Sequence, residues 1–122
     1  MEKSSKITSF TQLETWKEGH RLTLVVYKIT REFPKEELYA LGDQMRRAAI
    51  SVTSNVAEGF SRASKKEKTQ FYSVARGSLT ELQNQLLVAR DVRYITEEQF
   101  SQIADQTIKV SRLLTGLKRS AK

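Results

Sequence analysis

The stretch LYALGDQMRRAAISVTSNVAEGF, residues 38–60, decides the fold. It contains no proline, and its apolar side chains recur at intervals of three or four positions. An α-helix turns by ~100° per residue, so this spacing puts the apolar side chains on one face. The pattern predicts a core-facing helix whose buried stripe consists of Leu38, Leu41, Met45, Ala49, Val52 and Val56.

Three more helices are predicted by similar apolar spacing and by capping signals at their N-termini. They cover residues 12–32, 65–92 and 97–118, behind the capping-box pairs Thr11–Glu14, Ser64–Glu67 and Thr96–Gln99. Pro34 separates the first helix from the second, which resumes near residue 35. Short connections make sequential helices antiparallel neighbours, so we predict an all-α, up-down-up-down antiparallel four-helix bundle.

The length of 122 residues fits one domain. We expect a flexible N-terminal segment at 1–10, the bundle at 11–117 and a basic C-terminal tail at 118–122. The first residues lack the apolar core of a secretory signal, and no apolar run is long enough to cross a bilayer. These features predict a cytoplasmic protein without membrane contact.

The two middle helices are predicted to pack closely because small side chains face each other across them. Folding the chain at residues 62–63 sets Ala48, Ala49 and Ser51 opposite Ala75, Gly77 and Ser78. A glycine in mid-helix costs ~1 kcal/mol relative to alanine, and we expect this packing to compensate for Gly77. Arg46 or Arg47 is expected to form an ion pair with Glu81 across the same contact.

The first helix has two apolar faces, of which a bundle buries only one within its own subunit. One face carries Leu13, Trp16, His20, Leu24 and Tyr27. The other face must meet another subunit, a partner protein or an unusually wide core. We predict an oligomer interface there, formed by Leu22, Val25, Val26, Ile29 and Phe33.

Several chemistries lack the residues that they need. The chain has no cysteine, which excludes disulfides, thiolate nucleophiles and sulfur-rich metal sites. Its single histidine, His20, has no glutamate three residues before it, as a di-iron bundle would require. No phosphate loop or nucleophile elbow occurs. We therefore predict a protein that is not an enzyme and has no cofactor or metal; carboxylate chemistry by Glu58 and Glu81 is a distant alternative.

The charge distribution points to a polyanionic partner. Subtracting 14 acidic from 21 basic residues leaves a net charge of +7. Cations concentrate where the second helix ends and the third begins, and a helix N-terminus favours anions. We predict nucleic-acid contacts from Arg62, Lys65, Lys66, Lys68 and Arg76, with Arg46 and Arg47 as secondary contacts. The alternative is a lysine-rich turn that serves solubility alone.

Five motifs together carry a family resemblance. They are Phe10-x-x-Leu13-x-x-Trp16, Phe33-Pro34, Gln44-Met45-Arg46-Arg47-Ala48-Ala49, Ser51-x-x-Ser54-Asn55-Val56-Ala57-Glu58-Gly59 and Ala75-Arg76-Gly77-Ser78-x-x-Glu81-Leu82. The pattern resembles the small four-helix bundle proteins encoded in bacterial intervening sequences of 23S ribosomal RNA genes, over residues 10–117. The resemblance implies that six residues form a structural motif of the fold: Asn55, Glu58, Gly59, Gly77, Ser78 and Glu81.

The resemblance also implies an assembly and a partner. It implies a ring-shaped homo-oligomer, with a pentamer favoured, similar to the accessory proteins of diversity-generating retroelements. Those accessory proteins are basic rings that bind nucleic acid and a reverse transcriptase. We therefore expect binding of RNA or DNA with little sequence specificity. The alternative function is a protein-interaction scaffold for a partner encoded nearby, such as a reverse transcriptase, without direct nucleic-acid binding.

Overall fold

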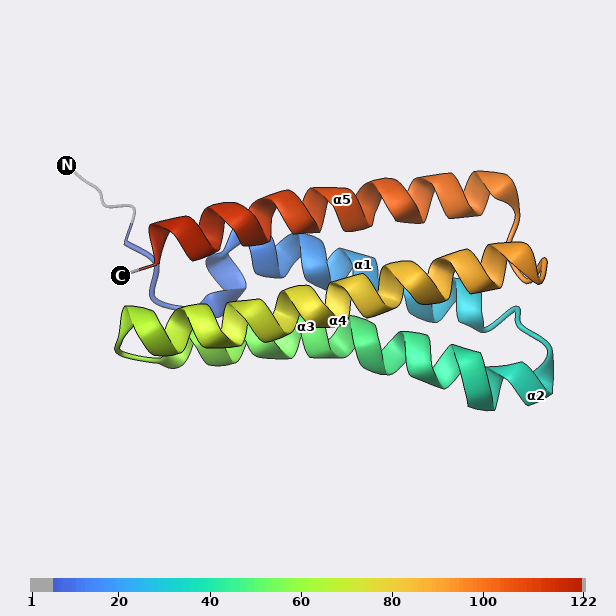
Figure 1. The fold of residues 1–122 in the computed structure, drawn as a ribbon, viewed down its shortest axis with the longest axis horizontal. Coiled ribbons are helices and arrows are strands. Elements are labelled where there is room, and N and C mark those ends of the chain that lie inside the picture. Colours follow the sequence, from blue (N-terminus) through green and yellow to red (C-terminus); the bar gives the residue numbers. More distant parts are fainter. Residues whose placement is uncertain (1–5, 122) are drawn as a thin grey trace.

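The computed structural model describes residues 6–121, and four long helices dominate that part of the chain (Figure 1). They are α1 (Glu14–Thr30), α3 (Asp43–Ser61), α4 (Lys65–Asp91) and α5 (Glu97–Ser120). Short connections join α3 to α4 and α4 to α5, and the longer segment at 31–42 joins α1 to α3. The contacts run α1 to α3, α3 to α4, α4 to α5 and α5 back to α1. This arrangement confirms the predicted antiparallel four-helix bundle.

The segment before α3 is more irregular than the predicted continuous helix over residues 35–60. A single helical turn, α2 (Lys35–Glu37), leads into a π-helical segment, Leu38–Gly42, before α3 begins. Gly42 is buried there, and a Cβ atom on it would lie 3.3 Å from the Glu37 carbonyl oxygen. From Met45 onward the predicted stripe is confirmed, because Met45, Ala49, Val52 and Val56 are all almost completely buried.

Two of the predicted N-terminal caps are present. The Ser64 hydroxyl accepts a hydrogen bond from the Glu67 amide at 3.1 Å. Thr96 and Gln99 form a complete capping box, in which each side chain bonds the backbone amide of the other residue. Since these caps satisfy amides that the helix leaves unpaired, they fix where α4 and α5 begin.

The predicted cap of the first helix is wrong. The capping box is formed by Ser9 and Gln12, and it opens an extra 3-10 turn, Phe10–Gln12, before α1 begins without a side-chain cap. The ring of Phe10 packs edge-on against Trp16, with their centroids 5.5 Å apart. Ser9 and Phe10 are therefore part of the fold, whereas residues 1–5 of the predicted flexible segment lie outside the described residues.

The predicted interface on the first helix is also wrong, because that face forms the core of the subunit. Leu22 and Val26 are fully buried, Ile29 and Phe33 are 7% and 5% exposed, and Val25 is partly buried. The inward face is the one that also carries small side chains, which let α3 approach. Gly19 is one of them, and a Cβ atom there would lie 3.0 Å from the Thr53 methyl group.

The opposite face of α1 faces outward. The Trp16 and His20 rings stack at a centroid distance of 4.7 Å, and His20 is exposed. Leu24, one turn further along, is 57% exposed. The first helix therefore has a second apolar face, as predicted, but its position is the reverse of the predicted one.

The contact of α3 with α4 is close, although not at the predicted glycine. The Ser51 and Ser78 hydroxyls lie 2.7 Å apart, and the Asn55 amide donates to the Ser51 carbonyl at 2.8 Å. A Cβ atom on Gly77 would meet nothing within 4 Å, because this residue faces outward. The tight position is Gly59, where a Cβ atom would lie 2.5 Å from the ring of Tyr72.

The two glycines predict opposite effects of the same substitution. Gly59→Ala should lower the free energy of unfolding by about 1–3 kcal/mol, since the buried Tyr72 ring must move. Gly77→Ala should raise it by up to about 1 kcal/mol, because alanine is the better helix former and the site is open. Urea denaturation of both variants beside the parent chain measures the two shifts. A stabilising Gly59→Ala would contradict the close contact.

A buried carboxylate joins α1 to α5. The Glu18 side chain is 6% exposed, and its Oε1 atom accepts from Gln106 Nε2 at 3.0 Å and lies 3.5 Å from Lys109 Nζ. Gln106 Nε2 also donates to the Glu18 carbonyl at 2.9 Å. The hydrogen bond from Gln106 lowers the pKa of Glu18 below its ordinary value of 4.5, with Arg21 and Lys109 assisting against the effect of burial.

This lowered pKa predicts a loss of stability in acid. The stabilisation is complete above the unfolded-state pKa near 4.5 and disappears as the pH falls through the lower folded-state pKa. Glu18→Gln should cost about 1–3 kcal/mol at neutral pH and flatten this acid dependence. Glu14→Gln is the control, because Glu14 is 64% exposed and makes only a loose contact with Lys17. Equal acid profiles for Glu18→Gln and the parent chain would contradict this role.

Candidate nucleic-acid interface

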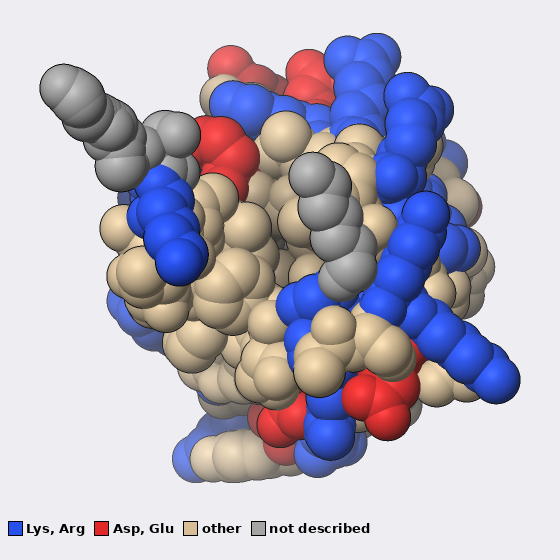
Figure 2. Space-filling view, turned by 90° about the vertical axis from the view of Figure 1, so that its left-hand side faces the viewer, with Lys and Arg blue, Asp and Glu red and all other residues tan. Residues whose placement is uncertain are grey.

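Four of the predicted cations lie where α3 turns into α4, at the end of the bundle where α5 also ends: Arg62, Lys65, Lys66 and Lys68. Figure 2 views the molecule from this end. Figure 2 shows Lys and Arg side chains following one side of this end, with acidic side chains at its upper and lower margins. The structure divides these cations into two groups. One group bonds to the protein itself, and the other group extends into solvent.

Arg62 and Lys68 belong to the first group. Arg62 Nη2 lies 3.0 Å from Glu58 Oε2, and the guanidinium stacks 4.6 Å from the centre of the Phe71 ring. Lys68 Nζ donates to the Phe60 carbonyl at 2.8 Å and to the Gly59 carbonyl at 3.4 Å. Since those carbonyls belong to the last turn of α3, Lys68 serves as a C-terminal cap.

Arg76 also bonds within the bundle. Its guanidinium donates to the Ser111 hydroxyl at 2.8 Å, to the Ser111 carbonyl at 3.0 Å and to the Thr115 hydroxyl. These bonds join the middle of α4 to α5. Most of the hydrogen-bonding capacity of Arg76 is therefore used before any ligand arrives.

The two secondary candidates lie elsewhere. Arg46 donates to Thr30 Oγ1 at 2.8 Å and to the Tyr27 carbonyl at 3.4 Å, and its guanidinium lies over the Tyr27 ring. Arg46 thus joins α3 to α1, and its predicted pairing with Glu81 is wrong. Arg47 and Glu81 line the same groove, but no ion pair joins these two described residues.

Lys65 and Lys66 are the predicted cations that extend into solvent at this end. Both are exposed, and neither forms a hydrogen bond or an ion pair through its side chain with the described part of the chain. They occupy the first turn of the 27-residue helix α4, where unpaired backbone amides carry partial positive charge.

Two further cations, Lys118 and Arg119 at the end of α5, lie near Lys65 and Lys66. The predicted tail at 118–122 is helical as far as Ser120, which puts Lys118 and Arg119 in the last turn of α5; Lys122 lies outside the described residues. Lys118 and Arg119 line a shallow groove of about 360 Å³ together with Thr69, Arg76 and Thr115. We call Lys65, Lys66, Lys118 and Arg119 the basic surface. The sequence predicts similar lengths for the antiparallel helices α4 and α5, and this similarity indicates that the start of α4 lies beside the end of α5.

The alternative carboxylate pair is not assembled. Glu58 forms an ion pair with Arg62. Glu81 instead lines a groove beside Arg47. Because Arg47 precedes Glu58 by eleven positions on α3, the two carboxylates are separated by about 16 Å along that helix. The described residues contain no group of three or more potential metal-binding side chains. Within the same residues, no helix has the length and hydropathy that crossing a membrane requires.

The fold and the basic surface define the class: a small, basic, antiparallel four-helix bundle protein. Residues 11–116 match the family described as 23S rRNA-intervening sequence protein, and the chain belongs to that family. The predicted family resemblance is therefore confirmed.

Comparison with solved structures supports the same fold. The chain is similar to a protein of unknown function from the S23 ribosomal protein family of Bacteroides thetaiotaomicron VPI-5482, with a TM-score of 0.80 and 17% sequence identity. The similarity covers 87% of this chain and 99% of the other. No curated protein shows a significant match to this sequence.

Proposed function

We propose that this chain is a non-enzymatic protein that binds RNA or DNA through the phosphate backbone, with little sequence specificity. The observation that carries the proposal is the basic surface, where the exposed Lys65, Lys66 and Arg119 and the half-buried Lys118 have no acidic partner among the described residues. Lysine and arginine side chains that neutralise phosphates release condensed counterions, which favours binding to nucleic acid of any sequence.

The local backbone adds to this attraction. Lys65 and Lys66 lie at the N-terminus of α4, whose dipole favours anions. Arg76 lines the adjoining groove and contributes positive charge to it, although Ser111 holds its guanidinium in place. The proposed contacts therefore differ from the sequence prediction: Lys118 and Arg119 join Lys65 and Lys66, while Arg62 and Lys68 act within the fold.

Charge reversal tests the proposed surface. The double variant Lys65→Glu and Lys66→Glu should weaken binding to a fluorescent single-stranded oligonucleotide at least tenfold and reduce the slope of log affinity against log salt by about 2. Fluorescence anisotropy across a salt series measures both quantities.

The matched control is Lys28→Glu with Lys35→Glu, which changes the net charge equally at the opposite end of the bundle (Figure 1). Equal loss in the two double variants would mean that net charge alone acts, and this result would overturn the proposed surface. Retained capture of a partner protein with no binding of nucleic acid would favour the scaffold function instead.

We further propose that the chain assembles as a homo-oligomer through the outward face of α1. Trp16, His20 and Leu24 form an apolar row there, and a row of this kind on a soluble surface favours contact with another protein. A face that meets a different surface on the next copy generates a ring when the rotation between copies closes, and the family resemblance implies such a ring of five copies. Assembly into a ring would pool several copies of the basic surface and increase avidity for a long polyanion.

Oligomeric mass tests this assembly. Light scattering after size-exclusion chromatography should give a multiple of the 14.0 kDa subunit mass, and Leu24→Glu should shift the protein to the monomer without unfolding it. Leu22→Ala is the contrasting variant, because Leu22 is fully buried and its loss should lower stability by about 2–5 kcal/mol. A parent chain that elutes as a 14.0 kDa species at micromolar concentration would contradict the assembly.

A further inference from the structure

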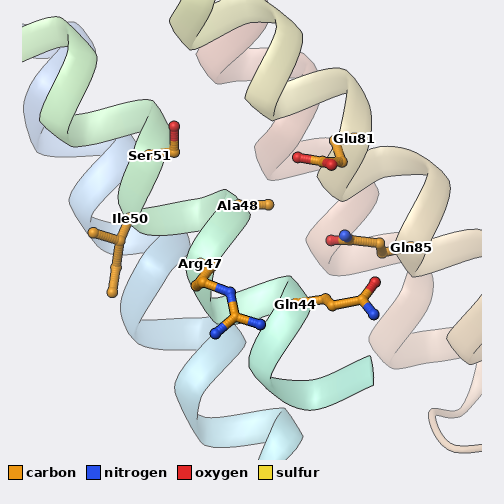
Figure 3. Close-up of a pocket in the computed structure, with 7 residues that line it drawn as sticks. All are labelled: Gln44, Arg47, Ala48, Ile50, Ser51, Glu81 and Gln85. Carbon is orange, nitrogen blue, oxygen red and sulfur yellow. The ribbon is translucent and has the colours of Figure 1, made fainter. Parts of the chain in front are cut away.

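One face of α4 carries exposed residues that no contact in the described structure uses. Gly77, Glu81 and Val88 follow Val74 by three, seven and fourteen positions, so all four residues lie on the same side of the helix. Val74 is 53% exposed and Val88 is 42% exposed. Figure 3 shows Glu81 extending toward α3 across a groove of about 550 Å³ between the two helices. We call these four residues the α4 face.

Gly77 gives the α4 face a shallow centre. The residue is exposed, and a Cβ atom on it would meet nothing within 4 Å. Glycine weakens the middle of a helix, and no packing in the described structure compensates for this loss. A glycine on a helix surface also lets another chain approach the backbone closely. The α4 face therefore has the shape of a seat between two exposed valines, Val74 and Val88.

Charged groups on α4 and on α1 complement each other. Glu81 is exposed, and its carboxylate forms no hydrogen bond or ion pair with the described part of the chain, although Arg47 lines the same groove. On α1, Arg21 lies beside the outward apolar row. Its side chain is 67% exposed, and its Nη1 atom makes only a loose contact of 3.5 Å with Glu18 Oε2. Glu81 and Arg21 can therefore pair between two copies.

Contacts inside the bundle fix the relative heights of α1 and α4. Gly19 of α1 lies opposite Thr53 of α3. Ser51, two positions before Thr53, lies opposite Ser78 of α4. Two helical positions correspond to about 3 Å of rise, and α1 and α4 run in the same direction (Figure 1). The residue after Gly19 and the residue before Ser78 therefore lie at nearly the same height.

Those two residues are His20 and Gly77. We propose that the α4 face of one copy receives the outward apolar row of α1 from the next copy, with the bundles side by side and pointing the same way. Rotation about an axis parallel to the bundles keeps every residue at its height, so His20 of one copy meets Gly77 of the next. Arg21 then comes within reach of Glu81, and every basic surface lies on one rim. The inference rests on the proposed assembly through α1 and identifies the surface that α1 meets.

The other exposed apolar groove lies at a different height. It encloses about 160 Å³ between α4 and α5, and Leu87 and Phe100 contribute to its lining. Leu87 follows Gly77 by ten positions, which places it about 15 Å further from the basic surface. At the height of His20, the same side of the bundle carries Arg76, which lines the basic groove. The α4 face is therefore the better match to the apolar row of α1.

A side chain at position 77 tests the α4 face. Gly77→Gln should raise the dissociation constant of the assembly on the order of tenfold, because the new side chain fills the space that His20 would occupy. The thermal unfolding midpoint should not fall, since the site is open within the subunit. Gly116→Gln on α5 is the matched control, because Gly116 is also exposed and open, and it should leave the assembly unchanged. Sedimentation over a concentration series measures the assembly.

A mixture of two variants tests whether these two faces meet each other. Leu24→Glu disables the α1 row and keeps the α4 face, whereas Gly77→Gln does the reverse. At a concentration where each variant alone is monomeric, an equimolar mixture should form a one-to-one complex of twice the 14.0 kDa subunit mass and nothing larger.

Charge exchange tests the proposed pair. Glu81→Arg should weaken the assembly, because it places a cation near Arg21 of the next copy. Adding Arg21→Glu to the same chain should restore the assembly, since the two charges are then exchanged. Adding Arg112→Glu instead, on the exposed surface of α5, is the control and should not restore it.

The outcomes separate this inference from the proposed assembly. A parent oligomer that Leu24→Glu disrupts, but that Gly77→Gln leaves as intact as Gly116→Gln does, would overturn the α4 face and keep the assembly through α1. A mixture that contains only monomers would also overturn the α4 face. A parent chain that is monomeric at micromolar concentration would overturn both proposals.

Discussion

The close packing of α3 on α4 is the constraint on which the rest of the molecule depends. Gly59 lies against the buried ring of Tyr72, and the neighbouring turn is closed by Lys68, which donates to the last carbonyls of α3. No larger residue at position 59 fits this approach without moving the ring. The turn leads directly into the first turn of α4, where Lys65 and Lys66 are exposed. The same packing creates the groove that contains Gln85.

The helices were predictable from local signals, and their orientation in the bundle was less so. Ser64 and Thr96 cap α4 and α5 as predicted, because capping depends on residues only three positions apart. The inward face of α1 was predicted incorrectly because both faces are apolar and periodicity cannot rank them. The choice depends on Gly19, whose missing side chain lets Thr53 of α3 approach. Gly19 lies three positions before Leu22, so the spacing places it on the inward face, but only the packed structure shows that α3 approaches there.

The candidate site shows the same division between local and long-range information. The cluster of cations near residue 65 was visible in the sequence, but the partners of those cations were not. Arg76 bonds to Ser111, thirty-five positions away, so its engagement depends on the packing of α4 against α5. The same packing brings Lys118 and Arg119 to the basic surface. Counting charges predicts a polyanionic partner, whereas only the fold separates cations that bond within the protein from those that face solvent.

The two surfaces of α4 differ in the kind of interaction that each can support. The basic surface consists of long side chains that are exposed except for the half-buried Lys118, and their attraction for phosphate is screened by salt and insensitive to base identity. The groove between α3 and α4 is open and is lined by both Arg47 and Glu81, whose opposite charges offset each other. An unpaired acceptor costs about 1–3 kcal/mol of stability, which a leucine at this position would not incur. The contact between α3 and α4 therefore combines tightly packed apolar and small side chains with one polar atom that its neighbours leave unsatisfied.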